Sequence, residues 1–387
     1  MNSATPRRPP PPVPVTILTG FLGAGKTSLL NRLLADPNLA DTVVLINEFG
    51  EIGIDHLLVE KVDGDMLLMA SGCLCCTIRG DLVNALEDLL RRLDNGRIKP
   101  FRRVVIETTG LADPAPVLHA IMGHPYLTLR YRLDGVVTAV DAINGLDTID
   151  RHKEAQRQVA VADRIALTKT DLLDPCDPAI FERLALRLAE LNPGAPRLDV
   201  ARGEATAAAL LSAGLFDPDT KIPDVGKWLR AEALAEPHTH RRDHGHGAHG
   251  HAHLHDVNRH GDSIAVFCLT RETPLAPRAF DLFLDLVRHA HGPKLLRVKG
   301  IVALADDPER PIVVHGVQHL FHPAVRLAGW PDADRRTRIV FILDGLGWDF
   351  VEGLFSAALG EARTDSPDLA ALRSNPLDPK PGGLLAG

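Results

Sequence analysis

The strongest constraint on the fold of this chain is the segment 15–34, where an apolar run leads into a glycine loop and then into leucines with helical spacing. The loop fits the phosphate-binding pattern G-x-x-x-x-G-K-[ST] with Gly20, Gly25, Lys26 and Thr27. Glycines let backbone N–H groups turn towards phosphate oxygens, the lysine neutralises phosphate charge, and the threonine hydroxyl can bind Mg²⁺. The segment therefore predicts a strand, a phosphate site and a helix, in that order.

Strand patterns alternate with helix patterns through the first half of the chain. The strands expected after the glycine loop are 42–46, 103–106, 135–140 and 164–167, with a short apolar segment at 66–70, and the helices are 79–93, 115–121, 151–162 and 178–190. Alternation of this kind indicates a parallel sheet with helices on both faces. We therefore expect an α/β fold, namely a P-loop NTPase with a doubly wound, mainly parallel sheet.

The composition changes near residue 221. Nine of the 18 histidines lie between His238 and His260 among glycine, alanine and aspartate, and such a stretch cannot build a core. Strand and helix patterns then return, which suggests a small α+β domain. The expected organisation is a disordered proline-rich arm at 1–14, a P-loop domain at 15–220, a histidine-rich linker at 221–262, an α+β domain at 263–350, and a helix with a loose tail at 351–387.

The segment Thr168–Asp171 follows an apolar strand and is close to the guanine-recognition pattern N-K-x-D. The carboxylate of Asp171 can accept hydrogen bonds from guanine N1–H and the exocyclic amine, a donor pair that adenine lacks. The stem of Lys169 can pack on the base. Thr168 departs from the usual asparagine, although its hydroxyl can still tie this loop to the phosphate loop. The alternative interpretation is a capped turn ahead of a helix.

Acidic residues follow two other strands. Glu107 ends a strand of the kind that presents a carboxylate to Mg²⁺ or its water, and the backbone N–H of Gly110 can approach the γ-phosphate. A plain cap of the following turn is the alternative role for Glu107. Glu48, Glu51 and Asp55 occupy the place of a first switch loop, where a ligand and a solvated side chain are equally good explanations of each.

Three thiols lie within four residues, at Cys73, Cys75 and Cys76. This spacing does not resemble a disulfide framework, and in a reducing compartment it indicates a metal or redox site. Thiolates are soft ligands for Zn²⁺, and no fourth ligand is adjacent, so we expect an open site completed by Glu, His or water. Buried cysteines without a metal, or a redox pair, are the alternatives.

Charge and hydropathy exclude two classes of partner. The net charge of −7 argues against non-specific nucleic-acid binding, which needs a basic face. No apolar run approaches the roughly 20 residues that span a bilayer, and the arm 1–14 lacks the apolar core of a signal peptide. We therefore expect a cytoplasmic protein that binds neither nucleic acid nor membrane.

Five motifs in this order resemble those of the CobW-type metal-chaperone GTPases, relatives of UreG and HypB. The motifs are Gly20–Thr27, Asn47–Glu51, Gly72–Cys76, Glu107–Gly110 and Thr168–Asp171. The histidine-rich stretch and the segment 263–350 also resemble that family, so the resemblance covers nearly the whole chain. It implies a GTPase that uses GTP and Mg²⁺, binds Zn²⁺ or Co²⁺, and has a client metalloprotein as partner. A homodimer is compatible with it.

The resemblance also implies roles for individual residues. Lys26 and Glu107 would be catalytic. The nucleotide would be held by Gly23, Ala24, Gly25, Lys26, Thr27, Ser28, Gly110, Lys169 and Asp171, and the metals by Cys73, Cys75, Cys76, Thr27 and Glu48.

The function expected is that of a GTP-hydrolysing metallochaperone, which couples nucleotide state to binding and transfer of a divalent transition metal, zinc before others. Cobalt delivery for corrin-ring synthesis is an alternative in the same class, because thiolate and imidazole ligands permit both metals. A metal storage or sensing protein with a structural nucleotide site is an alternative from another class. A kinase is a third, and it would require an acceptor-binding lid.

Overall fold

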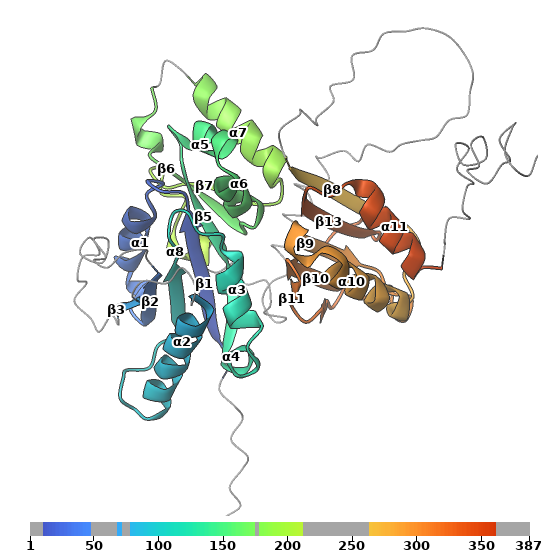
Figure 1. Ribbon diagram of the computed structural model, residues 1–387, viewed down its shortest axis with the longest axis horizontal. Coiled ribbons are helices and arrows are strands. Elements are labelled where there is room, and N and C mark those ends of the chain that lie inside the picture. Colours follow the sequence, from blue (N-terminus) through green and yellow to red (C-terminus); the bar gives the residue numbers. More distant parts are fainter. Residues whose placement is uncertain (1–10, 48–67, 72–77, 175–177, 212–262, 361–387) are drawn as a thin grey trace, which may run out of the picture.

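The computed structural model describes residues 11–47, 68–71, 78–174, 178–211 and 263–360. Within these residues the chain forms two β-sheets, each with helices packed against it (Figure 1). Residues before 200 build the first sheet, and residues after 263 build the second. The sequence motifs described above lie almost entirely on the first sheet and its loops.

The first sheet has seven described strands in the order β3-β2-β4-β1-β5-β6-β7, and each neighbouring pair is parallel. The strands are β1 (Val13–Gly20), β2 (Thr42–Asn47), β3 (Leu68–Ser71), β4 (Arg103–Glu107), β5 (Tyr131–Asp141), β6 (Arg164–Thr168) and β7 (Arg197–Asp199). The helices around them are α1 (Lys26–Leu34), α2 (Ile78–Asp94), α3 (Ala115–Met122), α4 (Pro125–Arg130), α5 (Gly145–Arg151), α6 (Lys153–Ala160), α7 (Ala179–Leu191) and α8 (Ala207–Leu211). The expected doubly wound parallel sheet is confirmed.

Alternate residues of the central strands enter two separate cores. Val104 and Ile106 of β4 lie in a cluster with side chains of α2 to α7, whereas Val105 lies in a cluster with side chains of α1 and α8. Successive side chains of a strand point to opposite faces, so a strand covered on both faces must be apolar throughout. This is why the strands of the first sheet read as continuous apolar runs in the sequence.

The second sheet is antiparallel, in the order β11-β10-β9-β13-β8, with β12 paired to β10. Its strands are β8 (Ile264–Arg271), β9 (Leu295–Val302), β10 (Ile312–Val317), β11 (Leu320–Phe321), β12 (Val325–Arg326) and β13 (Thr337–Asp344), and its helices are α10 (Pro277–His291) and α11 (Trp348–Ala358). Phe283 of α10 meets Phe341 of β13 and Phe355 of α11, with ring centroids 6.0 and 5.0 Å apart. The expected α+β arrangement of this part is confirmed.

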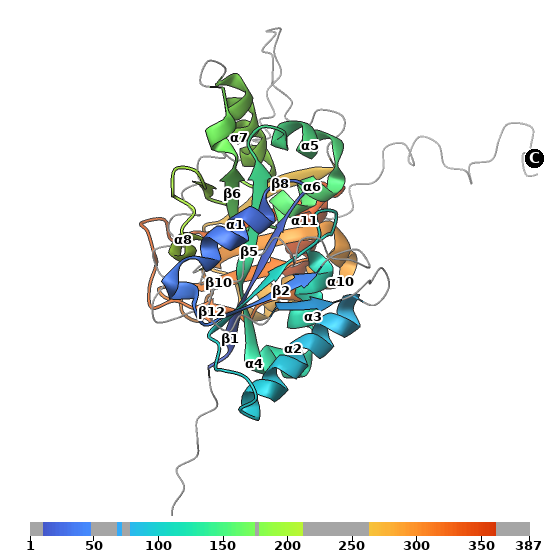
Figure 2. The same cartoon turned by 90° about the vertical axis from the view of Figure 1, so that its left-hand side faces the viewer.

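The second sheet packs against the helical face of the first unit that carries α3 and α6 (Figure 1). Ile264, Leu296, Val317 and Ile342 of the second sheet belong to the same buried cluster as side chains of those helices. Helices α1 and α8 cover the opposite face, and Figure 2, seen from the α1 side, shows the second sheet behind the first.

A buried charge cluster lies within this interface. The carboxylate of Asp163, just before β6, accepts hydrogen bonds from the Arg297 guanidinium and from the backbone N–H of Val136 at 2.9 Å, and it forms an ion pair with Lys299 Nζ at 3.0 Å. Burial alone would raise the pKa of Asp163, but the two cations outweigh it and hold that pKa well below its usual range. The cluster therefore joins the two units through a buried carboxylate that two cations contact.

Candidate functional site

The glycine loop joins β1 to α1 at the carboxyl edge of the first sheet. Gly23 and Gly25 have φ angles of 76° and 81°, in the left-handed region that favours glycine. Helix α1 begins at Lys26, directly after the loop. The loop therefore brings backbone N–H groups and a helix N-terminus together, an arrangement that binds anions.

The ammonium of Lys26 lies inside this loop. Its Nζ donates hydrogen bonds to the carbonyl oxygens of Gly20 at 3.0 Å and Phe21 at 3.3 Å, and only 9% of the residue is exposed. The positive charge is thus already placed where phosphate oxygens would bind.

Glu107 reaches the first turn of α1 because β4 pairs with β1, with Glu107 opposite Leu18. The Thr27 hydroxyl donates to Glu107 Oε1 at 3.1 Å, and Glu107 is 3% exposed. Hydroxyl and carboxylate oxygens are the ligands that Mg²⁺ prefers, so this pair fits a magnesium site beside the phosphate loop.

The loop after Glu107 also approaches the glycine loop. A Cβ added to Gly110 would lie 2.6 Å from the backbone nitrogen of Leu22, so no larger residue fits there without movement. This contact places Gly110 directly against the glycine loop.

Thr168 connects the end of β6 to the glycine loop. Its hydroxyl donates to the carbonyl oxygen of Ala24 at 2.7 Å and lies 3.2 Å from that of Val140. The threonine thus makes the connection for which an asparagine is usual in the N-K-x-D pattern.

Lys169 is held by Asp141, a residue to which the sequence assigned no role. Lys169 Nζ lies 2.7 Å from Asp141 Oδ2, and the same carboxylate accepts from the backbone N–H groups of Ile143 and Asn144. Burial opposes ionisation of Asp141, but these hydrogen bonds outweigh it and lower its pKa. Its position at the carboxyl end of β5 is the signal that could have identified it. Asp171 follows in an exposed turn, Thr170–Leu172.

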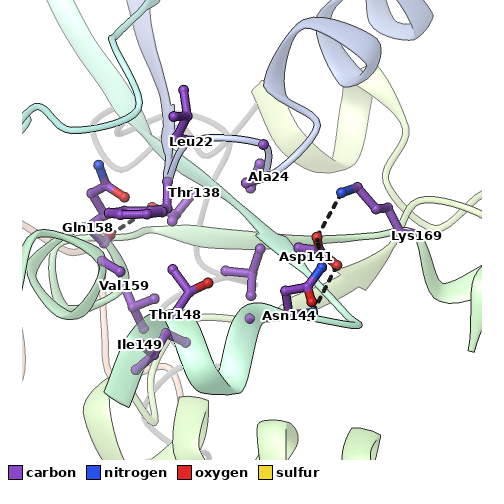
Figure 3. Close-up of a pocket in the computed structure, with 16 residues that line it drawn as sticks. Leu22, Ala24, Thr138, Asp141, Asn144, Thr148, Ile149, Gln158, Val159 and Lys169 are labelled. Atoms are coloured by element: carbon purple, nitrogen blue, oxygen red, sulfur yellow. Dashed lines mark hydrogen bonds and ion pairs between the residues drawn. The ribbon is translucent and has the colours of Figure 1, made fainter. Parts of the chain in front are cut away.

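A pocket lies between the glycine loop, the end of β5, α5 and α6 (Figure 3). Asp141, Asn144 and Lys169 line one end of it, and Gln158 and Val159 of α6 line the opposite end. The pocket thus connects the loop expected to read the base with the helix that faces the second sheet.

The expected metal ligands Cys73, Cys75, Cys76 and Glu48 lie outside the described residues, as do Glu51 and Asp55. Among the residues that are described, no group of three or more His, Cys, Asp or Glu side chains could hold a metal ion. The strands next to these segments are described, however. Ser71 at the end of β3 pairs with Asn47 of β2, and Ile46 of β2 pairs with Glu107.

In the part of the chain that the structure describes, every helix is too short or not apolar enough to cross a membrane.

Comparison with known families gives two matches. Residues 14–199 match the CobW/HypB/UreG nucleotide-binding domain, and residues 264–359 match the cobalamin synthesis protein CobW C-terminal domain.

Comparison with individual proteins gives relatives in a bacterium and a yeast. The zinc chaperone YjiA of Escherichia coli (strain K12) is 32% identical over 331 residues, which cover 86% of this chain and 94% of the relative. The zinc-regulated GTPase metalloprotein activator 1 of Schizosaccharomyces pombe is 40% identical over 185 residues, but the match covers only 44% of that protein. The crystal structure of Zn(II)-bound YjiA GTPase from E. coli superposes with a TM-score of 0.64 at 29% identity, over 92% of this chain and 100% of that one.

Proposed function

Because the chain belongs to the CobW/HypB/UreG family, we propose that it is a GTP-hydrolysing metallochaperone that takes up zinc and passes it to a client metalloprotein. A cytoplasmic location is part of this proposal, since thiolate ligands need a reducing compartment.

The contact between Thr27 and Glu107 is the observation that carries the GTPase part of the proposal. Both side chains would hold Mg²⁺ or its water, and bound Mg²⁺ supplies charge neutralisation at the phosphates. Lys26 would add its own charge, and the backbone N–H of Gly110, which lies against Leu22 of the glycine loop, would approach the γ-phosphate. Hydrolysis would then depend on positioning and on stabilisation of developing charge.

Zinc is the proposed cargo because three closely spaced thiolates suit it. The E. coli relative is named a zinc chaperone, and its solved structure contains Zn(II). The proposed ligands are Cys73, Cys75 and Cys76, with Glu48 as a further candidate. A client metalloprotein is proposed because the S. pombe relative is named a metalloprotein activator.

This proposal predicts that zinc affinity depends on the bound nucleotide. Competition with a zinc chelator is expected to show tighter zinc binding with a non-hydrolysable GTP analogue than with GDP, by about 5- to 150-fold, the usual range of coupling between sites. Thermodynamic linkage then requires zinc to tighten binding of the GTP analogue, relative to GDP, by the same factor.

The control for this measurement is a second titration, in which nucleotide affinities are determined with and without zinc. Equal zinc affinity in both nucleotide states would mean that the protein binds both ligands but is not a nucleotide-switched chaperone. Elemental analysis of protein isolated in each state decides between zinc and cobalt.

Guanine selectivity is expected to depend on Asp171, which we propose as the acceptor for the two guanine donors. Asp171→Asn removes a charge-assisted hydrogen-bond pair worth about 1.5 to 3 kcal/mol, so GTP affinity should fall about ten- to a hundredfold. Discrimination against xanthosine triphosphate should relax at the same time. Calorimetric titration with both nucleotides measures the two effects.

A matched control is Asp147→Asn, which removes an exposed carboxylate that pairs with Arg151 on α5. This control is expected to leave GTP affinity unchanged. Unchanged affinity in Asp171→Asn as well would refute the role assigned to Asp171.

A further inference from the structure

Helix α6 contains a buried amide that holds the loop after Glu107. Gln158 is 1% exposed, and its Nε2 donates to the carbonyl oxygens of Gly110 at 3.2 Å and Ala112 at 3.0 Å. The reverse orientation of the amide would place its oxygen against two carbonyl oxygens, so the chemistry fixes which end donates. Both peptide planes of the loop are therefore held by one side chain.

The backbone of Gln158 is itself anchored to the first sheet. Its carbonyl oxygen accepts a hydrogen bond from the Thr138 hydroxyl of β5 at 2.7 Å, and both residues are buried. Gln158 is thus a fixed point between the sheet and the loop. Figure 3 shows Gln158 at the end of the pocket opposite Lys169 and Asp141, which lie where the base is expected to bind.

The held loop is the one that touches the glycine loop. Gly110 lies against Leu22, and Glu107, three residues earlier, contacts Thr27. A shift of the loop away from α6 would therefore move Gly110 relative to the expected γ-phosphate position, while the contacts of Lys169 with Asp141 lie at the other end of the pocket.

The same loop is tied to the second unit by the neighbouring residue of α6. The Arg157 guanidinium lies 3.5 Å from Asp113 of the loop and 2.7 Å from Asp344 at the end of β13. Two successive residues of α6 thus contact the loop. Gln158 binds its peptide carbonyls, and Arg157 pairs with the side chain of Asp113.

We propose that Gln158 is a positioning residue for GTP hydrolysis, which holds residues 110–112 where the γ-phosphate is bound. The proposal rests on the GTPase function proposed above. It requires that loss of Gln158 lower the rate of GTP hydrolysis and the affinity for GTP. The affinity for GDP should change little, because GDP has no γ-phosphate.

The test is Gln158→Met, which keeps the length of the side chain and removes both donors. Two hydrogen bonds of ordinary strength are lost, so kcat is expected to fall about tenfold or more. Affinity for a non-hydrolysable GTP analogue relative to GDP should fall by a similar factor, whereas GDP affinity should stay within about threefold of wild type. Gln158→Leu, which also removes the donor and introduces no buried charge, replaces Gln158→Met if the latter does not fold.

A matched control is Asn192→Leu. The Asn192 amide is also buried and donates to carbonyl oxygens of α6 and the residues after it, at Val159, Ala160 and Ala162, but it does not touch the loop. The control should lower thermal stability while keeping the ratio of GTP-analogue to GDP affinity.

The outcomes separate this inference from the function on which it rests. A wild-type protein without GTPase activity would overturn the proposed function. Wild-type hydrolysis together with an unchanged kcat and an unchanged affinity ratio in the Gln158 variant would overturn only the positioning role. If the affinity for the GTP analogue relative to GDP falls equally in the Asn192 control, the effect comes from general destabilisation of α6. That result would also overturn the positioning role of Gln158.

Discussion

Asp163→Asn is expected to lower the free energy of unfolding by about 3 to 5 kcal/mol, because it leaves two buried cations without their shared counter-charge. Asp163, Arg297 and Lys299 are each at most 9% exposed, and the pair of cations comes from β9 of the second sheet. Asparagine keeps the size of the side chain, so the loss reports charge and not packing. Urea unfolding followed by circular dichroism measures the change.

The matched control is Asp94→Asn, which disrupts a bidentate salt bridge between Asp94 and Arg130 with N–O distances of 2.9 and 2.8 Å. Half of the Asp94 side chain is exposed, and exposed ion pairs contribute at most about 1 kcal/mol. Equal destabilisation by the two substitutions would show that burial does not strengthen the interface cluster.

Unfolding of the Asp163 variant is also expected to separate into two steps. The cluster is the most deeply buried charged part of an interface that also contains the Arg157–Asp344 ion pair and apolar contacts such as those of Leu296 and Ile342. Each sheet has a buried core of its own, so each unit can remain folded after the interface weakens. Fluorescence from Trp348, which packs against the core of the second unit, follows that unit.

The sequence predicted the first sheet well because its information is local. A strand buried on both faces is apolar at every position, and the glycine pattern after β1 has one structural meaning when an apolar run precedes it. Glu107 and Thr168 were identified as strand ends, and parallel strands bring their carboxyl ends to one edge.

The sequence predicted less wherever a contact joins distant segments. The helix expected at 151–162 corresponds to α6, but the sequence analysis missed α5, which ends at Arg151. The two helices are separated at His152, whose backbone is extended with φ −124° and ψ 116°. No local pattern shows that Gln158 would reach Gly110, 48 residues away, or that Asp163 would meet Arg297, 134 residues away. Such partners depend on how helices and sheets pack, which local propensity does not determine.

The largest effect on metal binding is expected from replacing Cys73, Cys75 and Cys76 together by serine. Loss of one outer-shell partner of a metal site costs about 10- to 100-fold in affinity, so loss of three proposed thiolate ligands should cost considerably more. Chelator competition should therefore show no tight zinc site. Binding of GTP should persist, because Lys26, Thr27 and Glu107 belong to other segments.

The matched control for this variant is Cys268→Ser, which removes a thiol on β8 of the second sheet. It should bind zinc as the wild type does. Tight zinc binding that survives in the triple variant would move the site elsewhere in the chain, with the histidines between 238 and 260 as the next candidates.

The triple variant should also lose the effect of zinc on GTP turnover, and the order of the strands gives the reason. The segment that contains the cysteines begins after Ser71 of β3 and ends before Ile78 of α2. Two strand spacings, about 10 Å, separate β3 from β4, where Glu107 contacts Thr27. A site anchored that close to the expected γ-phosphate can be ordered by GTP and released on hydrolysis, as switch segments are. If turnover of the triple variant still responds to zinc as the wild type does, the response comes from another site, and proximity of the cysteines to β4 does not explain it.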